Sequence, residues 1–543
     1  MKRPLSQAIA GSLVLLVIPA ACAVAAVSSH LAGGPGWLAP NYDVEYNYLL
    51  NGLRFEQGIP IVFFIQPATT LALLYAAIIH VSHAVAPVGA ADVVEDVWRH
   101  PEAYVGRVHA SLVVLLLCAS FAAGVLVWRR TRSLPAGVAV QTGLILLTAL
   151  AQSAGLIWPE TLLAVVGVLF AGTLTLFVLD DCSSPRLCVA LGVLGALGIA
   201  SKVTFAVVAL APALLPRSRR HSMLYVAVLA GSTAVLLAPI AGRIPHLVGF
   251  LGGFAARSGS YGTGATGFGV REYLRGVILL VRQNKIPALL LLLSAGAFFA
   301  FRRSAALQDA QRSELRALGV VTLVELLLYG VVARQPYVRY LIPAVTLMGV
   351  NLVIIQRIGL SVWHQRRRTV QAFLMLGLAV LLSVWVRNTR SALASTKSDA
   401  AEHWATVEAA ASLQKSGAVM VLGSWASSPA YALAIGQFWV GDAWGKVGEE
   451  LYPGQLFLSG EGYLKTWNQG LGAGWEWPNI NPVLSRAAED VEWERVVALL
   501  KGHRVIAQGD WENIAPSLRR NPRISIQVIH RSRLESLVEL RLR

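Results

Sequence analysis

The sequence predicts a polytopic α-helical membrane protein with a small α/β domain at its C-terminal end. Of its 543 residues, 55% are hydrophobic and only 14% are charged, whereas about 25% of the residues in an ordinary soluble domain are charged. The mean hydropathy is +0.58, and the apolar residues gather in runs of about 20, the length that a helix needs to cross a bilayer. After residue 387 these runs stop, and charges of both signs replace them.

The composition excludes a soluble enzyme, a disordered chain and a secreted module built on disulfides. The four cysteines, at positions 22, 118, 182 and 188, lie in or beside apolar runs and form no CxxC pair. The formal charge of +16 lies entirely in residues 1–387, which hold 30 basic and 14 acidic residues, whereas residues 388–543 hold 16 of each. This distribution indicates membrane orientation, so membrane lipids are expected partners and nucleic acid is not.

About eleven apolar runs are interpreted as transmembrane helices, because a backbone exposed to lipid must satisfy its own hydrogen bonds. Their ranges are 6–27, 107–128, 137–156, 161–179, 187–200, 203–216, 222–241, 286–301, 318–333, 337–355 and 369–386. The loops on one side carry 17 of the 30 basic residues, which makes that side cytoplasmic. We therefore expect a multi-pass protein of the cytoplasmic (inner) membrane, with a cytoplasmic N-terminus and with residues 28–106 and 388–543 outside.

Two apolar segments allow a second interpretation. Residues 1–26 have the basic start and Ala-rich end of a cleaved signal peptide, but the apolar stretch exceeds the usual length, which favours a retained first helix. If segment 61–86 crossed the membrane, the later basic clusters would change sides. It is therefore interpreted as a re-entrant or interfacial helix.

The chain is expected to form two domains. Residues 1–387 form the membrane domain, in which the first outer loop, 28–106, carries amphipathic helices. Residues 388–543 form the small α/β domain. Its patterns predict helices over 401–415, 427–437 and 489–502, and strands over 418–422, 505–508, 524–530 and 536–541.

Acidic residues are scarce in the membrane domain, so each one can be weighed. Asp43 and Glu45 follow the first span, where a helix with an apolar and aromatic stripe begins. With that stripe on the membrane surface, both carboxylates would stand near the helix N-terminus and face an outer cavity. The alternative is that Asn41 or Asp43 merely caps the helix.

Two further acids occupy costly positions, and the others do not. Glu160 follows Trp158 and Pro159 at the outer mouth of two spans, where a carboxylate is expensive unless it is paired or functional; the alternative is a helix-start charge in contact with water. Glu325 lies well inside a span, and a structural pairing with an arginine is expected. Eight other acids are interpreted as solvated charges: Asp92, Glu95, Asp96, Glu102, Asp180, Asp181, Asp309 and Glu314.

Cations on the predicted outer side form a second set. They can hold a lipid phosphate through charge-assisted hydrogen bonds, or they can extend to ordinary lipid headgroups. Lys202 lies in a hinge between two short helices, and Arg334 and Arg339 flank a Gln-Pro-Tyr turn. The full set is Arg54, Lys202, Arg243, Arg257, Arg271, Arg275, Lys285, Arg334 and Arg339.

Three other patterns carry little chemistry. The Gly-rich loop 249–269 contains a GxGxxG spacing, but no strand precedes it, which excludes a nucleotide-binding loop. His80 and His83 are weak metal-ligand candidates because no carboxylate is paired with them nearby in the sequence. Most late tryptophans are expected in the core, whereas Trp475 and Trp477 are candidates to touch a glycan or the membrane.

Several segments, taken in order, resemble the membrane-embedded GT-C glycosyltransferases that use a polyprenyl-phosphate sugar, such as the protein O-mannosyltransferases and the lipid A aminoarabinose transferases. The matching pieces span residues 6–386 and are Asp43-Val44-Glu45-Tyr46 with Gly58, Gln66-Pro67-Ala68-Thr69, Arg107, Trp158-Pro159-Glu160, Gly198-Ile199-Ala200-Ser201-Lys202 and Arg339-Tyr340-Leu341-Ile342-Pro343. Gln66 and Glu160 depart from the family, which has His or Lys and Asp at these steps. The C-terminal domain resembles no particular subfamily.

The resemblance implies a GT-C-like fold and an inverting sugar transfer at the outer face. The donor would be a polyprenyl-phosphate-linked sugar, and the acceptor a lipid, glycan or protein. Asp43 would be the general base, and Glu45 and Glu160 would orient groups or bind a divalent metal ion, if one is used. The donor phosphate would be bound by a set of cations: Lys202, Arg334, Arg339 and Arg54.

Two other classes of protein remain as alternatives. One is a polytopic transporter or lipid-carrier flippase, and the other is a non-enzymatic envelope assembly protein. A transporter is expected to carry polar residues inside its spans and to show repeats. The gathering of carboxylates at one outer surface favours the enzyme.

Overall fold

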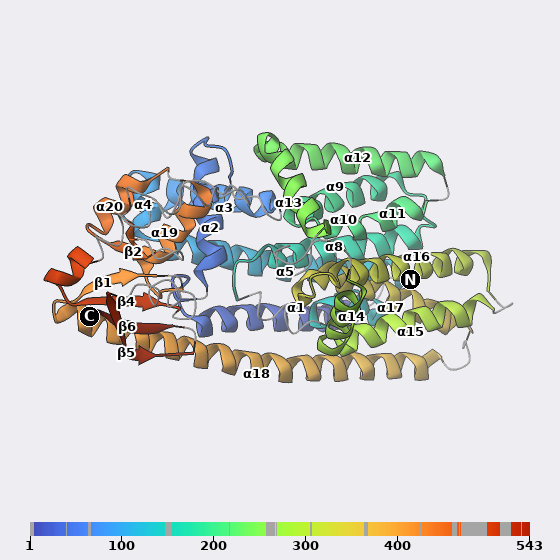
Figure 1. The fold of residues 1–543 in the computed structure, drawn as a ribbon. Coiled ribbons are helices and arrows are strands. Elements are labelled where there is room, and N and C mark those ends of the chain that lie inside the picture. Colours follow the sequence, from blue (N-terminus) through green and yellow to red (C-terminus); the bar gives the residue numbers. More distant parts are fainter. Residues whose placement is uncertain are drawn as a thin grey trace. The chain divides into compact units, whose positions relative to one another are not determined.

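The computed structural model describes residues 5–39, 41–62, 67–146, 155–216, 218–256, 267, 269–303, 307–362, 367–423, 425–441, 443–458, 464–465, 467, 497–510, 523–533 and 535–543. The chain divides into two compact units. The membrane unit consists of residues 1–29, 64–71 and 110–392. The outer unit consists of residues 30–63, 72–109 and 393–543, and so combines most of the first outer loop with the C-terminal domain. Figure 1 shows the elements of both units, which are described separately.

Eight helices of the described chain are long and apolar enough to cross a membrane. They coincide with eight of the predicted spans, so the polytopic helical architecture is confirmed. They are α1 (Leu5–Gly33), α5 (Pro101–Thr131), α8 (Pro159–Leu179), α12 (Arg219–Leu237, continued by η2, Ala238–Arg243, and α13, Ile244–Ala256), α15 (Lys285–Arg302), α16 (Asp309–Val332), α17 (Ile342–Val362) and α18 (Arg367–Lys415).

The three remaining predicted spans correspond to shorter elements. Residues 137–156 overlap α6 (Leu134–Gln141) and η1 (Thr142–Ile145), and the segments 187–200 and 203–216 correspond to α9 (Pro185–Ser201) and to α10 (Phe205–Val208) with α11 (Leu210–Leu214). None of them reaches the length of about 20 residues that spans a bilayer. The total of eleven spans therefore stays a prediction, as does the re-entrant path of 61–86, where α3 (Thr69–Val85) has 17 residues.

Close backbone contacts hold the helices of the membrane unit together. A Cβ added at Gly349 of α17 would lie 2.7 Å from the Val140 carbonyl oxygen of α6. At Gly192 of α9, an added Cβ would lie 2.8 Å from the side chain of Val228 on α12, which runs beside α9 in Figure 1. Residues without side chains permit this approach, which supplies van der Waals contact where lipid removes the hydrophobic driving force.

Two acids of the membrane unit have partners that differ from the sequence predictions. The predicted Arg partner of Glu325 is wrong, because the Asn351 amide on α17 donates to Glu325 Oε2 at 2.8 Å. Asn351 is fully buried and already offers the donor that the carboxyl group needs. The solvated state predicted for Glu314 is also wrong, because Glu314 is buried and pairs with Arg357 at 2.8 Å.

The outer unit contains a mixed six-stranded sheet in the order β3-β2-β1-β4-β6-β5. The strands are β1 (Val419–Leu422), β2 (Leu456–Leu458), β3 (Leu464–Lys465), β4 (Val505–Gly509), β5 (Ile524–Arg531) and β6 (Ser536–Leu542). β1 pairs in parallel with β2 and β4, and the other pairings are antiparallel. This confirms the predicted α/β domain and four of its strands; β2, β3 and the short α20 (Gly445–Leu451) were not predicted.

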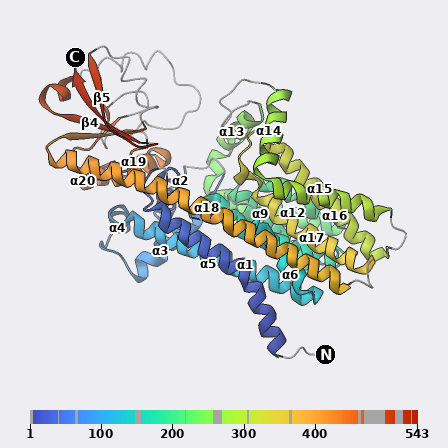
Figure 2. The same ribbon diagram turned by 90° about the horizontal axis from the view of Figure 1, so that it is seen from below.

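The predicted helices of this domain differ in their outcome. The helix predicted over 427–437 corresponds to α19 (Pro429–Val440). The helix predicted over 401–415 is the end of α18, which runs for 49 residues without interruption (Figure 2). Much of the helix predicted over 489–502 lies outside the described residues, as do Trp475 and Trp477.

The helix predicted after the first span begins at Tyr42, as α2 (Tyr42–Glu56), but its aromatic stripe lies inside the protein. Tyr46, Leu49 and Leu50 are buried. A Cβ added at Gly436 of α19 would lie 3.1 Å from the Tyr46 carbonyl oxygen, so α19 covers this face. The apolar face is therefore not exposed on the membrane surface, because the C-terminal domain supplies an apolar partner for it.

The carboxylate of Asp96, on α4 (Val93–Arg99), organises the outer loop instead of facing solvent. It accepts hydrogen bonds from the amides of Val88 at 3.0 Å and Gly89 at 2.8 Å, and from the Tyr104 hydroxyl at 2.5 Å. Its side chain is fully buried. Burial alone would raise the pKa of Asp96, but these bonds and one with His83 hold it well below its usual range. The prediction of a solvated charge is wrong here.

We expect Asp96→Asn to destabilise this loop by about 2 kcal/mol, because the amide group cannot accept all of these hydrogen bonds. Hydrogen exchange of residues 88–90 should accelerate roughly 30-fold at neutral pH. The stabilisation in the wild type should persist above the ordinary pKa of 3.8 and decline as the pH falls below it. Glu95→Gln, which removes an exposed pair with Arg99, is the control, and equal exchange in both variants would contradict the assignment.

Candidate functional site

Glu160 is the centre of a buried charged group in the membrane unit. Trp158 has an extended backbone, Pro159 starts α8, and Glu160 lies in its first turn. Glu160 Oε1 accepts a hydrogen bond from Lys202 Nζ and lies 3.6 Å from Arg339 Nε. The side chains of Glu160 and Lys202 are 1% and 4% exposed, so one carboxylate faces two cations away from water.

Lys202 is held in place by its own backbone and by the segment that begins at Pro67. It follows the last residue of α9 in an extended conformation and forms an isolated antiparallel bridge with Pro67. The hydroxyls of Thr70 and Ser201 are 2.7 Å apart, and the Thr69 hydroxyl donates to the Ala200 carbonyl at 3.3 Å. The hinge predicted from the sequence is therefore a fixed support for the ammonium group.

Aromatic rings hold both cations. Arg339 belongs to η4 (Val338–Leu341), just before α17, and its guanidinium lies 3.9 Å from the centre of the Trp158 ring. Lys202 Nζ lies 3.9 Å from the centre of the Tyr340 ring. Cation–π contacts of this kind stabilise charges that have lost water. Sequence reasoning quoted these two aromatic residues only as neighbours of charged ones, and this adjacency was the signal that could have identified them.

The group carries more positive than negative charge. One Glu160 carboxylate compensates for two cations, and Arg339 Nε is buried without a hydrogen-bond partner among the described residues. A buried surplus cation with a spare N–H donor is suited to bind an anion with several oxygens, such as a phosphate. Because Glu160 already faces two cations, it is poorly suited to accept a proton or to bind a metal ion.

The two other predicted phosphate-binding cations make different contacts. Arg334 donates to the Gly267 carbonyl at 3.3 Å, just beyond the end of α16. Arg54 donates to the Pro60 carbonyl at 3.0 Å and so helps to fix the turn after α2. No printed contact joins Arg334 to the Glu160 group among the described residues.

The predicted acids of the outer unit lie on α2. Asp43 is in the first turn of this helix, and its side chain lies outside the described atoms. Glu45 is 1% exposed, and a Cβ at Gly36 would lie 2.6 Å from its carboxylate. Asn41 precedes the helix but does not cap it, because its side chain donates to the carbonyls of Gly33 and Pro35. The simple capping alternative therefore fails for Asn41.

Glu102 was predicted as a solvated charge, but it binds the residues around Glu45. It accepts from the Gly36 amide at 2.8 Å and from the Tyr46 hydroxyl at 2.6 Å. Burial, and then the nearby Glu102 charge, raise the pKa of Tyr46 well above its usual range, so its hydroxyl keeps its proton and donates. Long-range contacts over more than 50 residues create this arrangement, and no local pattern signals it.

The described residues contain no group of three or more His, Cys, Asp or Glu side chains arranged to hold a metal ion. His80 and His83 do not form a joint site, because His80 contacts Glu56 and His83 contacts Asp96. Gln66 and most of the Gly-rich loop lie outside the described residues. No step of the chemistry below is therefore assigned to a metal ion.

A Ser-His-Glu grouping in the outer unit is structural. The Ser427 hydroxyl donates to Glu535 Oε2 at 2.6 Å, and His403 Nδ1 lies 2.9 Å from the same oxygen. Gln508 donates to the other carboxylate oxygen at 2.6 Å. All four side chains are buried. A nucleophilic serine would need its hydroxyl bonded to the histidine and open to substrate, so this cluster fixes the sheet and does not form an active site.

Comparisons with known proteins give matches among solved structures. No family model and no curated protein matches the chain. The chain is similar to the crystal structure of ArnT from Cupriavidus metallidurans bound to undecaprenyl phosphate, with 14% identity, a TM-score of 0.49 and 97% of each chain covered. The structure of the same protein in the apo state matches with 14% identity, a TM-score of 0.45 and 98% of each chain covered. The function proposed below rests on the residues of the chain itself.

We expect Glu160→Gln to lower the free energy of unfolding by about 3 kcal/mol, because it leaves two buried cations without a counter-charge. Adding Lys202→Met should recover part of this loss, since one uncompensated charge is then removed. Thermal unfolding of the purified protein in detergent measures both effects. Asp180→Asn breaks the exposed pair with Arg130 and should cost under about 1 kcal/mol. A double variant less stable than Glu160→Gln would contradict the charge argument.

Proposed function

We propose that the protein is a GT-C-type membrane glycosyltransferase that moves a sugar from a polyprenyl-phosphate donor to an acceptor at the outer face of the cytoplasmic membrane. The observation that carries this proposal is the buried group in which Lys202 and Arg339 share the single carboxylate of Glu160. A donor phosphate supplies the missing negative charge and accepts from the spare Arg339 N–H.

The order of the sequence motifs supports the same function. Glu160, Lys202 and Arg339 come from three separate motifs of the GT-C resemblance, 42 and 137 positions apart along the chain. These motifs supply the members of one charged group within the membrane unit. A match of scattered motifs that also share a contact is more specific than any motif alone.

The proposed reaction is a single displacement with inversion at the anomeric carbon. The acceptor hydroxyl attacks this carbon, the bond from the carbon to the phosphate oxygen breaks, and the hydroxyl proton passes to Asp43 as general base. The lipid phosphate leaves with the electron pair of the broken bond. Lys202 and Arg339 stabilise the charge that develops on it.

The other acids have supporting roles in this scheme. Glu160 positions the two cations and keeps both of them charged. Glu45 is buried beneath the first turn of α2 and orients that turn, and with it Asp43. Arg54 and Arg334 contribute to donor binding from the surface. The acceptor class is a lipid, glycan or protein.

We expect Asp43→Asn to lower transfer by at least about 100-fold, the usual contribution of a general base. The assay uses the purified enzyme in vesicles that contain a lipid-linked sugar, and it follows both sugar transfer and the release of polyprenyl phosphate. Glu56→Gln, an acid-to-amide change at the other end of α2, is the control and should retain its activity. Wild-type turnover by the Asp43 variant would refute the assignment, whereas lipid translocation without transfer by the wild type would indicate a flippase.

We expect Arg339→Gln to weaken binding of polyprenyl phosphate roughly tenfold or more, because it removes a charge-assisted hydrogen bond worth about 1.5–3 kcal/mol. Arg339→Lys should restore binding only in part, because an ammonium group lacks the planar stack on Trp158. Titration of the detergent-solubilised protein with a short-chain polyprenyl phosphate measures both. Arg243→Gln, at a distant outer-facing cation, is the control, and an equal loss there would place the phosphate elsewhere.

A further inference from the structure

A groove of about 520 Å³ lies between α15 and α16 in the membrane unit, within the volume range of ligand-binding clefts. These two helices run side by side in Figures 1 and 2. The body of the groove is apolar and is lined by Phe298, Phe299, Val320 and Leu323. Phe299 is 62% exposed and Leu323 is 51% exposed, so this surface is open to the hydrocarbon of a bilayer.

One end of this groove is strongly basic. Arg302 ends α15, and Arg312 and Arg316 lie in the first turns of α16, and all three line the groove. Each is exposed, and none of the three has an ion-pair partner among the described residues. Arg312 and Arg316 donate to the backbone carbonyls of Leu307 and Leu214, which orients the guanidinium groups but leaves their charge uncompensated.

The nearby acids do not neutralise these arginines. Glu314 lies between Arg312 and Arg316 in the sequence, but its carboxylate pairs with Arg357 at 2.8 Å. Asp309, at the start of α16, forms no salt bridge within the described part of the chain. Three positive charges therefore surround the open end of an apolar groove. An anionic headgroup attached to acyl chains complements both parts.

We propose that this groove binds one anionic phospholipid of the cytoplasmic leaflet, with its phosphate on Arg302, Arg312 and Arg316 and an acyl chain along Phe298 and Leu323. The basic loops of the sequence assign this end of α16 to the cytoplasmic side. Thr322 adds a buried hydroxyl without a hydrogen-bond partner among the described residues, about 9 Å along the helix from Arg316 at 1.5 Å per residue. It lies at the depth where a phospholipid presents its ester oxygens.

The site is separate from the proposed transfer site. Arg312 lies near the N-terminal end of α16, and Arg339 lies beyond its C-terminal end. α16 has 24 residues, and at 1.5 Å per residue it is about 36 Å long. The bound phospholipid is thus a structural partner and is not the sugar donor.

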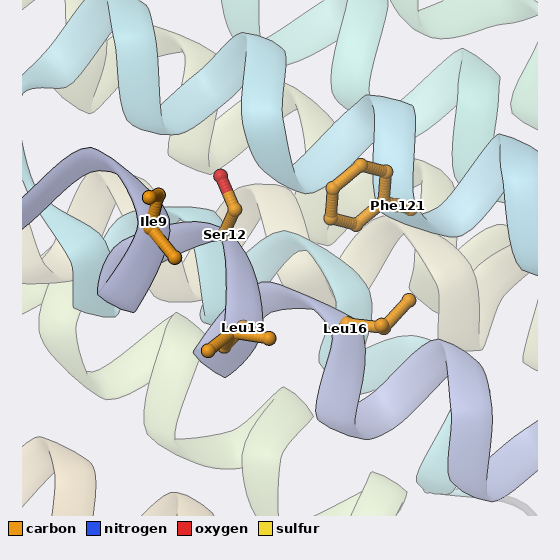
Figure 3. A pocket seen from close by; sticks show the side chains of 5 residues that line it. All are labelled: Ile9, Ser12, Leu13, Leu16 and Phe121. Carbon is orange, nitrogen blue, oxygen red and sulfur yellow. The ribbon is translucent and has the colours of Figure 1, made fainter. Parts of the chain in front are cut away.

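A second groove within the membrane unit provides a contrast. It lies between α1 and α5, has a volume of about 300 Å³, and is lined by Ile9, Ser12, Leu13, Leu16 and Phe121 (Figure 3). Its lining carries no charged side chain. Such a groove accepts any acyl chain and does not select a headgroup, so the arginines distinguish the α15–α16 groove.

The test is native mass spectrometry of the full-length protein from nanodiscs that contain equal amounts of phosphatidylglycerol and phosphatidylcholine. We expect the wild type to retain phosphatidylglycerol preferentially. Arg312→Gln with Arg316→Gln should lower that preference roughly 30-fold, from about 1 kcal/mol for each basic residue, whereas the Lys double variant should keep most of it. Arg129→Gln with Arg219→Gln removes two exposed arginines outside the groove and should leave the preference unchanged.

Ala295→Phe fills the apolar part of the groove without changing its charge and should also displace the lipid. An unchanged preference after the Gln double substitution, or an equal loss in the Arg129 and Arg219 control, would overturn the proposal. Displacement by polyprenyl phosphate at lower concentration than by phosphatidylglycerol would also overturn it, because the occupant would then be the donor lipid. If the Gln double variant does not fold, the Lys and Phe variants decide between these outcomes.

Discussion

One carboxylate, that of Glu160, joins three separate stretches of the membrane unit. It starts α8, binds the lysine in the hinge after α9, and approaches the arginine that precedes α17. Each of these charges would be costly to bury alone, and each is tolerated because the others are present. Lys202 in turn bridges to Pro67, so a segment of the first outer loop also depends on this contact. Support and binding chemistry therefore coincide at one point of the fold.

The sequence predicted the elements whose signal is local. Apolar runs located the eight long helices, and period-two alternation located β1, β4, β5 and β6. Their formation depends on residues within one segment, which a single sequence displays. β2 and β3 were missed because they have only three and two residues. Such short strands exist only because a neighbouring strand supplies their hydrogen bonds.

The candidate site was predictable in part. Glu160, Lys202 and Arg339 stood out because charges are rare among apolar runs. Their aromatic partners, Trp158 and Tyr340, did not stand out, because aromatic residues are common at the ends of membrane helices. Asp96 and Glu102 were misjudged as solvated. Their burial arises from contacts with distant parts of the loop, and a run of acids in a sequence does not reveal whether hydrogen-bond donors surround it.

The pair formed by Glu325 and Asn351 has a consequence for the helices that carry it. Each residue projects a polar group into an otherwise apolar interface between α16 and α17, and each satisfies the other. A shift of one helix by a single turn, about 5.4 Å, would leave both groups facing hydrocarbon. The pair therefore fixes the register of the two helices, as a buried asparagine does in a coiled coil. Apolar packing alone would tolerate several alignments of α16 and α17, and this one polar contact selects among them.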